Sequence, residues 1–202
     1  MKSLVDVELI KAVQNRDKQA FRTLFSLYKQ KVYGTAYLIL KDYQLAEDIV
    51  QETFLQVFLK LTKLKEPLYF ERWLYKITVN LCLDSVRKQK RHPVSSLEEY
   101  MEIQTDFSLK TMSTPETEAI YRDMQKKILQ CIYSLSAKYA TVLVLHYYNN
   151  FTIKEIAQIT NSSETAVKTR LFRARKTLEK ELDKKQLEIM NKPTGGDYLE
   201  YR

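Results

Sequence analysis

The chain has 202 residues, of which 45% are apolar, and its 33 Lys and Arg against 25 Asp and Glu give a formal charge of +8. That apolar content suffices for one or two compact cores and excludes a chain that is disordered throughout. The positive balance suits a polyanionic partner, although many ordinary soluble proteins share it. With only three glycines and four prolines, and with helix-forming residues at helical spacing, the sequence predicts an all-α fold.

The first segment, residues 5–91, is almost continuously helical in pattern. Its longest apolar stripe recurs at three- and four-residue steps and consists of Phe21, Leu24, Phe25, Tyr28, Val32, Ala36 and Ile39. Such a stripe buries one face of a long helix against neighbouring helices. We therefore expect a helical bundle as the first domain.

Within this bundle, the stretch QLAEDIVQETFLQVFLKL (residues 44–61) predicts a helix with two different faces. One face is an apolar core stripe: Val50, Phe54, Val57 and Leu61. The other mixes acids, amides and leucines: Asp48, Gln51, Glu52, Leu55, Gln56 and Leu59. The second face suits a protein partner with basic residues around an apolar centre. The alternative is a helix buried on all sides in a thick bundle.

The next stretch, LYFERWLYKITVNLCLDSVRKQKR (residues 68–91), places an aromatic ring and an amide among cations. One side collects Trp73, Lys76, Asn80, Arg87 and Arg91. Aromatic rings beside cations can stack on unpaired bases while the charges hold the backbone, so single-stranded DNA is a plausible ligand. Tyr69 and Phe70 precede this helix and are expected to line a pocket for an extruded base. Alternatively, these aromatic residues belong to the bundle core.

A change of composition divides the two helical parts. Residues 92–114 have little periodicity, and residues 92–120 hold six acids against one lysine, which indicates a flexible acidic linker. Thr114, Pro115 and Glu116 supply an N-cap, a proline at the first helical position and an acid in the first turn. A second small helical domain is expected at residues 115–185, followed by a tail at residues 186–202.

The second domain contains NFTIKEIAQITNSSETAVKTRLFRARKTL (residues 150–178), which predicts two helices joined by a tight turn. Thr152 and Glu155 have the spacing of a capping box at the start of the first helix. Asn161 tolerates the left-handed backbone that a tight reversal needs, and Ser163 can cap the second helix. The pattern therefore predicts a helix-turn-helix.

Helical spacing gives the second helix of this motif a core stripe and an opposite polar face. The core stripe is Val167, Leu171, Ala174 and Leu178. The candidate groove-reading face contains Ser163, Thr165, Lys168, Thr169, Phe172, Arg173 and Lys176, with Arg170 and Arg175 on its flanks near the phosphates. The alternative is a basic helix that is merely solvated.

No residue pattern predicts catalysis, a cofactor or a metal site. Cys82 and Cys131 lie far apart among apolar residues and are expected to be reduced packing thiols. His92 and His146 are isolated, with no ligand or triad spacing around them. No apolar run reaches the ~20 residues of a membrane span and the N-terminus is not of signal-peptide type, so a cytoplasmic protein is expected.

Three motifs in order resemble the extracytoplasmic-function group of sigma-70-family RNA polymerase sigma factors. They are LAEDIVQETFLQVF, then FERWLYKITVNLCLDSVRKQKR, then the helix-turn-helix IKEIAQITNSSETAVKTRLFRARKTL. With the aromatic stripe that precedes them, the resemblance covers most of the chain. It departs from the family where Asn161 replaces a common glycine, where Phe172 replaces a frequent histidine, and where LSAKY replaces a Leu-Pro segment.

The resemblance implies a function for each surface. The face from Asp48 to Leu59 would dock on the coiled coil of the polymerase β′ clamp, and residues 69–91 would recognise and help melt the promoter −10 element. Residues 163–176 would read the −35 element in a second domain that also meets the β flap. The acidic linker would pass near the active cleft. An anti-sigma factor, often membrane-bound, would hold the protein inactive.

Two rival classes remain open from the residues. A stand-alone helix-turn-helix regulator would bind duplex DNA as a symmetric dimer and would leave the Asp48 face and the Trp73 stripe unexplained. A helical enzyme acting on nucleic acid would need a metal-spaced carboxylate cluster or a nucleophile with its base, and neither stands out.

Overall fold

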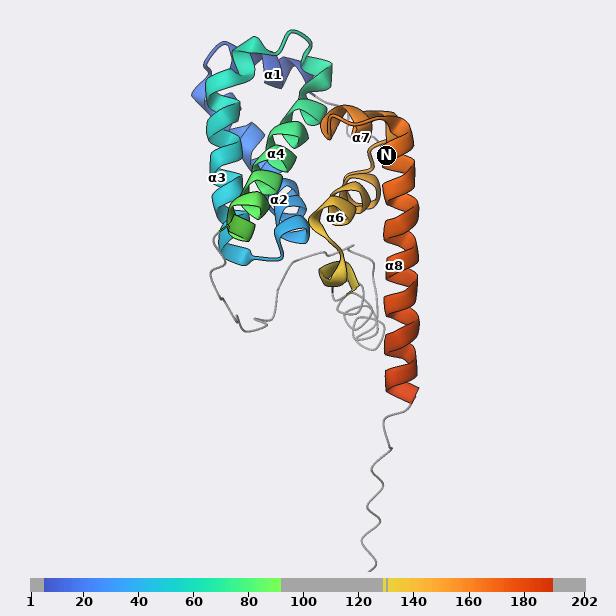
Figure 1. The fold of residues 1–202 in the computed structure, drawn as a ribbon. Coiled ribbons are helices and arrows are strands. Elements are labelled where there is room, and N and C mark those ends of the chain that lie inside the picture. The colour runs from blue at the N-terminus through green and yellow to red at the C-terminus, as the bar shows by residue number, and fades with distance from the viewer. Residues whose placement is uncertain (1–5, 92–128, 130, 191–202) are drawn as a thin grey trace, which may run out of the picture.

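The computed structural model describes residues 6–91, 129 and 131–190, and within these ranges every regular element is a helix. The all-α prediction is confirmed. The N-terminal domain consists of α1 (Val7–Gln14), α2 (Lys18–Leu40), α3 (Tyr43–Lys60), the 3₁₀ turns η1 (Leu61–Lys63) and η2 (Pro67–Tyr69), and α4 (Phe70–Arg91). The C-terminal domain consists of α6 (Ala137–Leu143), a π-helical turn η3 (Val144–Tyr148), α7 (Ile153–Ile159) and α8 (Glu164–Met190). Figure 1 shows both domains.

Aspartate residues start the first three helices. The side chain of Asp6 accepts a hydrogen bond from the backbone N–H of Leu9, and Asp17 and Asp42 do the same at the starts of α2 and α3. These bonds satisfy N–H groups that have no partner inside a helix. Each helix therefore begins where the sequence provides a short acidic acceptor.

The N-terminal domain packs α1, α2, α3 and α4 around one apolar cluster. Leu24, Tyr28 and Val32 of the predicted α2 stripe are buried in it, together with Phe54 and Val57 of α3. Phe21 and Phe25 lie at the edge of this cluster, where they make edge-on ring contacts with Phe58 and Phe54. The predicted bundle is confirmed.

In the C-terminal domain, α6 passes without a break into the π-helical turn, and α7 and α8 form the helix-turn-helix. Ser136 occupies the N-cap position of α6, but its side chain makes no capping hydrogen bond. The helix α8 is longer than predicted and continues to Met190 (Figure 1). The expected linker at residues 92–114, the cap at Thr114 and most of the tail lie outside the described residues.

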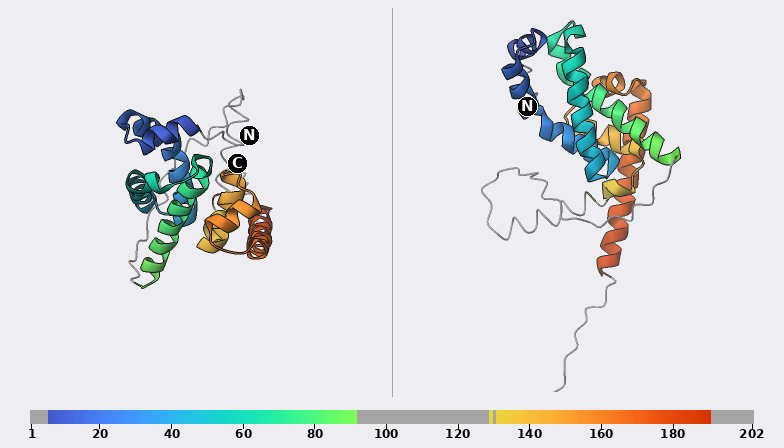
Figure 2. Two further views of the ribbon diagram at one scale, coloured as in Figure 1. Left: turned by 90° about the horizontal axis from the view of Figure 1, so that it is seen from above. Right: turned by 90° about the vertical axis from the view of Figure 1, so that its left-hand side faces the viewer.

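The two domains pack against each other through a second apolar cluster that both of them build. It joins residues of α2, α3 and α4, such as Tyr37 and Tyr75, to residues of α6, α7 and α8, such as Leu143, Ile156 and Val167. Both views of Figure 2 show the C-terminal helices beside α2 and α4. The sequence predicted two domains but did not predict this shared core.

Candidate nucleic-acid interface

The helix-turn-helix has the local geometry that its sequence predicts. The Thr152 hydroxyl accepts the Glu155 backbone N–H at 3.3 Å, and the Glu155 carboxylate accepts the Thr152 backbone N–H at 2.9 Å, which completes the capping box. Asn161 has φ 48°, in the left-handed region, and the Ser163 hydroxyl accepts the Ala166 N–H at 3.2 Å. These caps fix the angle between α7 and α8.

The helix α8 separates its core face from its polar face as expected. Val167, Leu171 and Ala174 are buried, and Leu178 is partly buried. The exposed residues of the predicted groove-reading face are Ser163, Thr165, Lys168, Thr169, Phe172, Arg173 and Lys176. Phe172 is 65% exposed, which is unusual for an aromatic ring without a partner surface.

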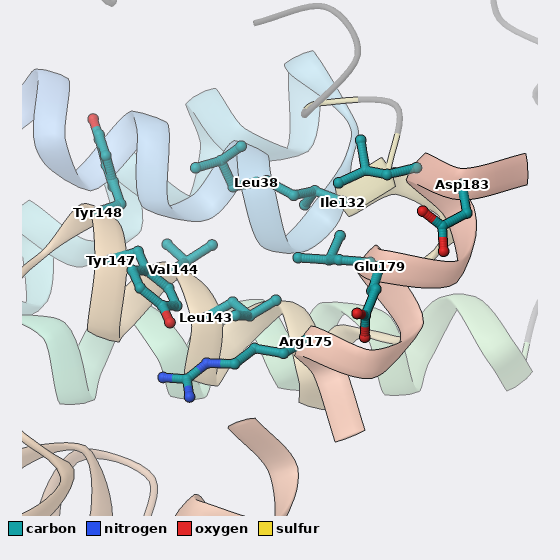
Figure 3. A pocket seen from close by; sticks show the side chains of 11 residues that line it. Leu38, Ile132, Leu143, Val144, Tyr147, Tyr148, Arg175, Glu179 and Asp183 are labelled. Atoms are coloured by element: carbon teal, nitrogen blue, oxygen red, sulfur yellow. The ribbon is translucent and has the colours of Figure 1, made fainter. Parts of the chain in front are cut away.

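The two flanking arginines of α8 are partly engaged within the protein. Arg170 donates to the Ser162 hydroxyl at 3.4 Å, and the Arg175 guanidinium lies 5.5 Å from the centre of the Tyr147 ring. The head group of Arg170 is therefore oriented by the turn between α7 and α8, and that of Arg175 by η3 (Figure 3). This is the placement expected of phosphate-positioning groups beside a base-reading face.

On α4, the predicted cationic stripe is only partly available. Lys76 and Asn80 are exposed one helical turn apart, and Trp73 is half-buried at the edge of the bundle core. Arg87 is exposed but forms an ion pair with Asp84. The side chain of Arg91, the last residue of α4, lies outside the described residues.

One expected residue of this surface is misplaced. Phe70 is fully buried, with its ring 5.3 Å from the ring of Tyr28, so it cannot line an exposed base pocket. Phe70 begins α4 on the side that faces α2, and the bundle closes over it. Tyr69, one residue earlier, is half-exposed, and the Arg72 guanidinium lies 4.0 Å from its ring centre. Arg72 is not among the residues that the sequence pattern predicted for this surface, although a cation three residues after Tyr69 is a usable signal.

The mixed face of α3 is exposed, which rejects the alternative of a helix buried on all sides. Leu55 and Leu59 are 50% and 52% exposed. Asp48 and Gln51 are exposed, while Glu52 and Gln56 are partly buried and joined by a hydrogen bond of 2.7 Å. The leucines therefore form an apolar centre that no part of the described chain covers.

Phe58 extends this face and was also missed. Its ring is 45% exposed, and the Arg16 guanidinium lies 5.3 Å from its centre while donating to the Phe58 carbonyl at 3.0 Å. Phe58 follows Leu55 by three residues, so helical spacing alone could have placed it there. The face thus carries three apolar side chains.

The described residues hold no group of three His, Cys, Asp or Glu side chains that could bind a metal ion. Cys82 and Cys131 are both buried, and burial raises the pKa of the Cys82 thiol to about 12. Both thiols pack in the interior, as the sequence predicts. Over the same residues, no helix has the length and hydropathy needed to cross a membrane.

Known proteins are similar to this chain in sequence and in fold. The family model described as Sigma-70 region 2 matches residues 24–92, and the model described as Sigma-70, region 4 matches residues 125–178. The ECF RNA polymerase sigma factor SigW of Bacillus subtilis is 34% identical over 181 residues, which cover 86% of this chain and 94% of the relative. The ECF RNA polymerase sigma-E factor of Haemophilus influenzae is 29% identical, with 89% and 96% covered.

Solved structures with the same fold include a sigma factor, RpoE, in complex with the anti-sigma factor NepR from Bartonella quintana. It has a TM-score of 0.64 at 20% identity and covers 81% of this chain and 96% of its own. The structure of CnrH in complex with the cytosolic domain of CnrY has a TM-score of 0.61, also at 20% identity, with 89% and 97% covered.

Two region models in the expected order define a transcription initiation factor of the sigma-70 type. Within that class, the chain belongs to the extracytoplasmic-function RNA polymerase sigma factors. The family resemblance stated from the three motifs is thereby confirmed. Proteins of this family are not enzymes, because the catalytic activity of transcription resides in the polymerase. The N-terminal and C-terminal domains are called region 2 and region 4 from here on.

Proposed function

We propose that this sigma factor assigns its three exposed surfaces to three different partners in transcription initiation. The α3 face with Asp48, Leu55 and Leu59 docks on the coiled coil of the polymerase β′ clamp. Tyr69 of η2 and the exposed stripe of α4 with Asn80 bind the opened −10 element. The polar face of α8 reads the −35 element in duplex form, while region 4 also meets the β flap.

The observation that carries this proposal is the simultaneous exposure of three chemically different surfaces. An acid-and-leucine face offers Asp48 and Gln51 to basic groups and Leu55 to an apolar centre. A ring beside cations suits unpaired bases, and a capped cationic helix fits the major groove. A stand-alone regulator would need only the last of these surfaces.

A regulatory partner follows from the same surfaces. Leu55, Phe58 and Leu59 are each about half-exposed on a protein that must stay soluble before it meets the polymerase. Two solved structures with the same fold are complexes with an anti-sigma factor or with the cytosolic domain of a second protein. We therefore propose that an anti-sigma factor covers the α3 face of this chain in the cytoplasm, where it can also hold the chain at the membrane.

The test is reconstituted initiation. Purified protein is added to core RNA polymerase with a genomic promoter library, and specific transcript starts are mapped. The expected result is a set of starts that share −10 and −35 sequences and disappear without the protein. No specific start, together with binding of the protein alone to a palindromic duplex, would instead support a stand-alone regulator.

The docking assignment has its own test in Asp48→Lys. The change places a cation on the exposed acid-and-leucine face and should abolish core polymerase binding, while binding to duplex −35 DNA stays unchanged. Lys76→Asp is the charge-matched control on α4 and should leave core binding intact. Unchanged core binding by the Asp48 variant would remove the α3 face from the docking surface.

A further inference from the structure

The connection between α3 and α4, residues 61–69, carries two exposed side chains at the end of the proposed −10 surface. Leu68 is 65% exposed and Tyr69 is 52% exposed. Within this connection, Leu61 alone is buried, and Leu64 packs at the edge of the same apolar cluster. A segment with so few apolar contacts gains little from core packing that would hold one conformation. Its hydrogen bonds therefore decide how it presents the Tyr69 ring.

Gln14, the last residue of α1, provides hydrogen bonds from outside the connection. Its side-chain Nε2 donates to the backbone carbonyl of Leu61 at 3.1 Å and to that of Leu64 at 2.7 Å. Both carbonyls lie beyond the last residue of α3, so that helix offers them no donor. Among the described residues, no other side chain has a hydrogen bond to the backbone of this connection. Gln14 therefore holds the connection at two points.

Arg16 extends the same row of donors toward α3. Its guanidinium donates to the Phe58 carbonyl at 3.0 Å. The three carbonyls that the α1–α2 turn binds, those of residues 58, 61 and 64, are therefore spaced three residues apart. Residues at this spacing lie on one side of a 3₁₀ turn, which explains how one short segment reaches all of them. The turn between α1 and α2 is thus bound both to the end of α3 and to the connection.

Phe70 holds the other end of the exposed stretch, because its ring is fully buried in the bundle core. Only residues 65–69 lie between this residue and the carbonyls that Gln14 binds, and Pro67 in their middle has a fixed φ. A short stretch that is held at both ends samples few conformations, so the Tyr69 ring is pre-organised. Loss of the Gln14 hydrogen bonds would release the upstream end and leave Phe70 in the core.

We propose that Gln14 is a positioning residue for −10 recognition: its two hydrogen bonds hold the α3–α4 connection in the conformation that presents Tyr69 to an unpaired base. Gln14 acts through this connection and does not need to contact DNA. A ring that is already in place binds without the cost of ordering it, so Gln14 contributes to affinity. The base-binding step rests on the proposed function, whereas the fixed conformation of the connection does not.

The first experiment measures the connection without DNA or polymerase. Gln14→Met keeps an unbranched side chain of similar length and removes both donated hydrogen bonds. Hydrogen exchange at the Leu64 and Tyr69 amides, which are bonded inside the connection, should become about 5-fold faster, the change that one net hydrogen bond gives. Gln44→Met, the same substitution at an exposed position at the far end of α3, should leave both rates unchanged. Wild-type rates in Gln14→Met would overturn the proposal.

A rescue variant separates the loss of the donor from a loss of packing. Gln14→Lys places an ammonium group at similar reach, with three donors for the same two carbonyls. It should keep the Leu64 and Tyr69 amides as protected as they are in the wild type. Fast exchange in Gln14→Lys as well as in Gln14→Met would show that packing of α1, and not the donor, holds the connection, and would overturn the proposal.

Binding of a labelled single-stranded oligonucleotide of random sequence tests whether the fixed connection acts through Tyr69. Gln14→Met should weaken binding roughly 5-fold if about one molecule in five still presents the ring correctly. In a Tyr69→Ala background the same substitution should have no effect, because the ring that Gln14 positions is absent. An equal loss of affinity with and without the ring would indicate a general effect on structure and would overturn the positioning role.

Tyr69→Ala by itself reports on the proposed function. If it weakens oligonucleotide binding while Gln14→Met does not, the inference is overturned and the proposed function stands. If Tyr69→Ala leaves the affinity unchanged, the assignment of Tyr69 to the −10 element is contradicted, and the role of Gln14 in base binding falls with it. Weaker binding by both single variants, with no further loss in the double variant, supports the inference and the proposed function together.

Discussion

The helices α4 and α8 are both cationic and both assigned to DNA, but they differ in how much of their surface packs against the rest of the protein. The polar face of α8 is exposed along its predicted length, since Val167, Leu171, Ala174 and the partly buried Leu178 meet the core on the opposite side. In contrast, α4 packs against α2 and α3 on one side and against α7 on another. Only the narrow stripe that contains Lys76 and Asn80 is left for a ligand.

This difference shows on which helices a charge pattern predicts the ligand-binding face. On a helix that packs on one side, cations and apolar residues separate cleanly, so the sequence predicts its ligand face. On a helix that packs on two sides, an aromatic residue such as Phe70 or Trp73 can pack in the core as readily as it can bind a ligand. Four sets of substitutions test this contrast, in order of decreasing expected effect.

Phe70→Ala should act on stability. Its ring is fully buried against Tyr28, so truncation should cost about 3–5 kcal/mol of unfolding free energy. Tyr69→Ala, the exposed neighbour, should change stability by less than about 0.5 kcal/mol. It should instead weaken single-stranded DNA binding by about 1–3 kcal/mol. Urea denaturation measures the effect on stability, and oligonucleotide titration measures the effect on binding. Equal stability of the Phe70→Ala and Tyr69→Ala variants would place Phe70 outside the core.

On α8, Lys168→Ala and Arg173→Ala should each weaken −35 binding by about 1–3 kcal/mol where a base contact is lost. Competition between duplexes with and without the −35 sequence measures the loss, while core polymerase binding should not change. Lys180→Ala, an exposed lysine farther along the same helix, is the control. A loss of affinity of equal size on every duplex would show that both side chains contact phosphates and not bases.

Substitution of Lys76, an exposed cation of α4, should have a smaller and less selective effect on DNA binding. Lys76→Ala should weaken binding to all single-stranded sequences alike and lower the slope of log affinity against log salt by about 0.7, which corresponds to one phosphate contact. Salt titrations of oligonucleotide binding give this slope. Lys60→Ala, on the exposed end of α3, should leave it unchanged. A slope that Lys76→Ala leaves intact would remove this lysine from the −10 surface.

Asn161→Gly should have the smallest effect. The residue has φ 48°, where glycine has no steric penalty, so unfolding free energy should rise by less than about 1 kcal/mol. DNA binding should not change, because the angle between α7 and α8 is already fixed by their caps. Thermal unfolding measures the gain, and a loss of stability would show that the Asn161 side chain itself supports the turn.

The sequence was sufficient wherever a structure depends on residues close together in the chain. The capping box of Thr152 and Glu155, the left-handed Asn161 and the core stripe of α8 were all predicted and are confirmed. The exposed leucines of α3 follow from the same helical period. Caps, turns and amphipathic faces are fixed within a few residues, so a short window of sequence specifies them.

Only the tertiary structure decided which aromatic residues are core and how the two domains meet. Neighbouring residues do not distinguish buried Phe70 from half-exposed Tyr69, because the closing surface comes from α2. The lack of a side chain at Gly34 is explained only by the ring of Tyr148, which lies more than a hundred residues later in the chain. Such contacts depend on the volumes and bonding groups of side chains that the chain brings together only by folding.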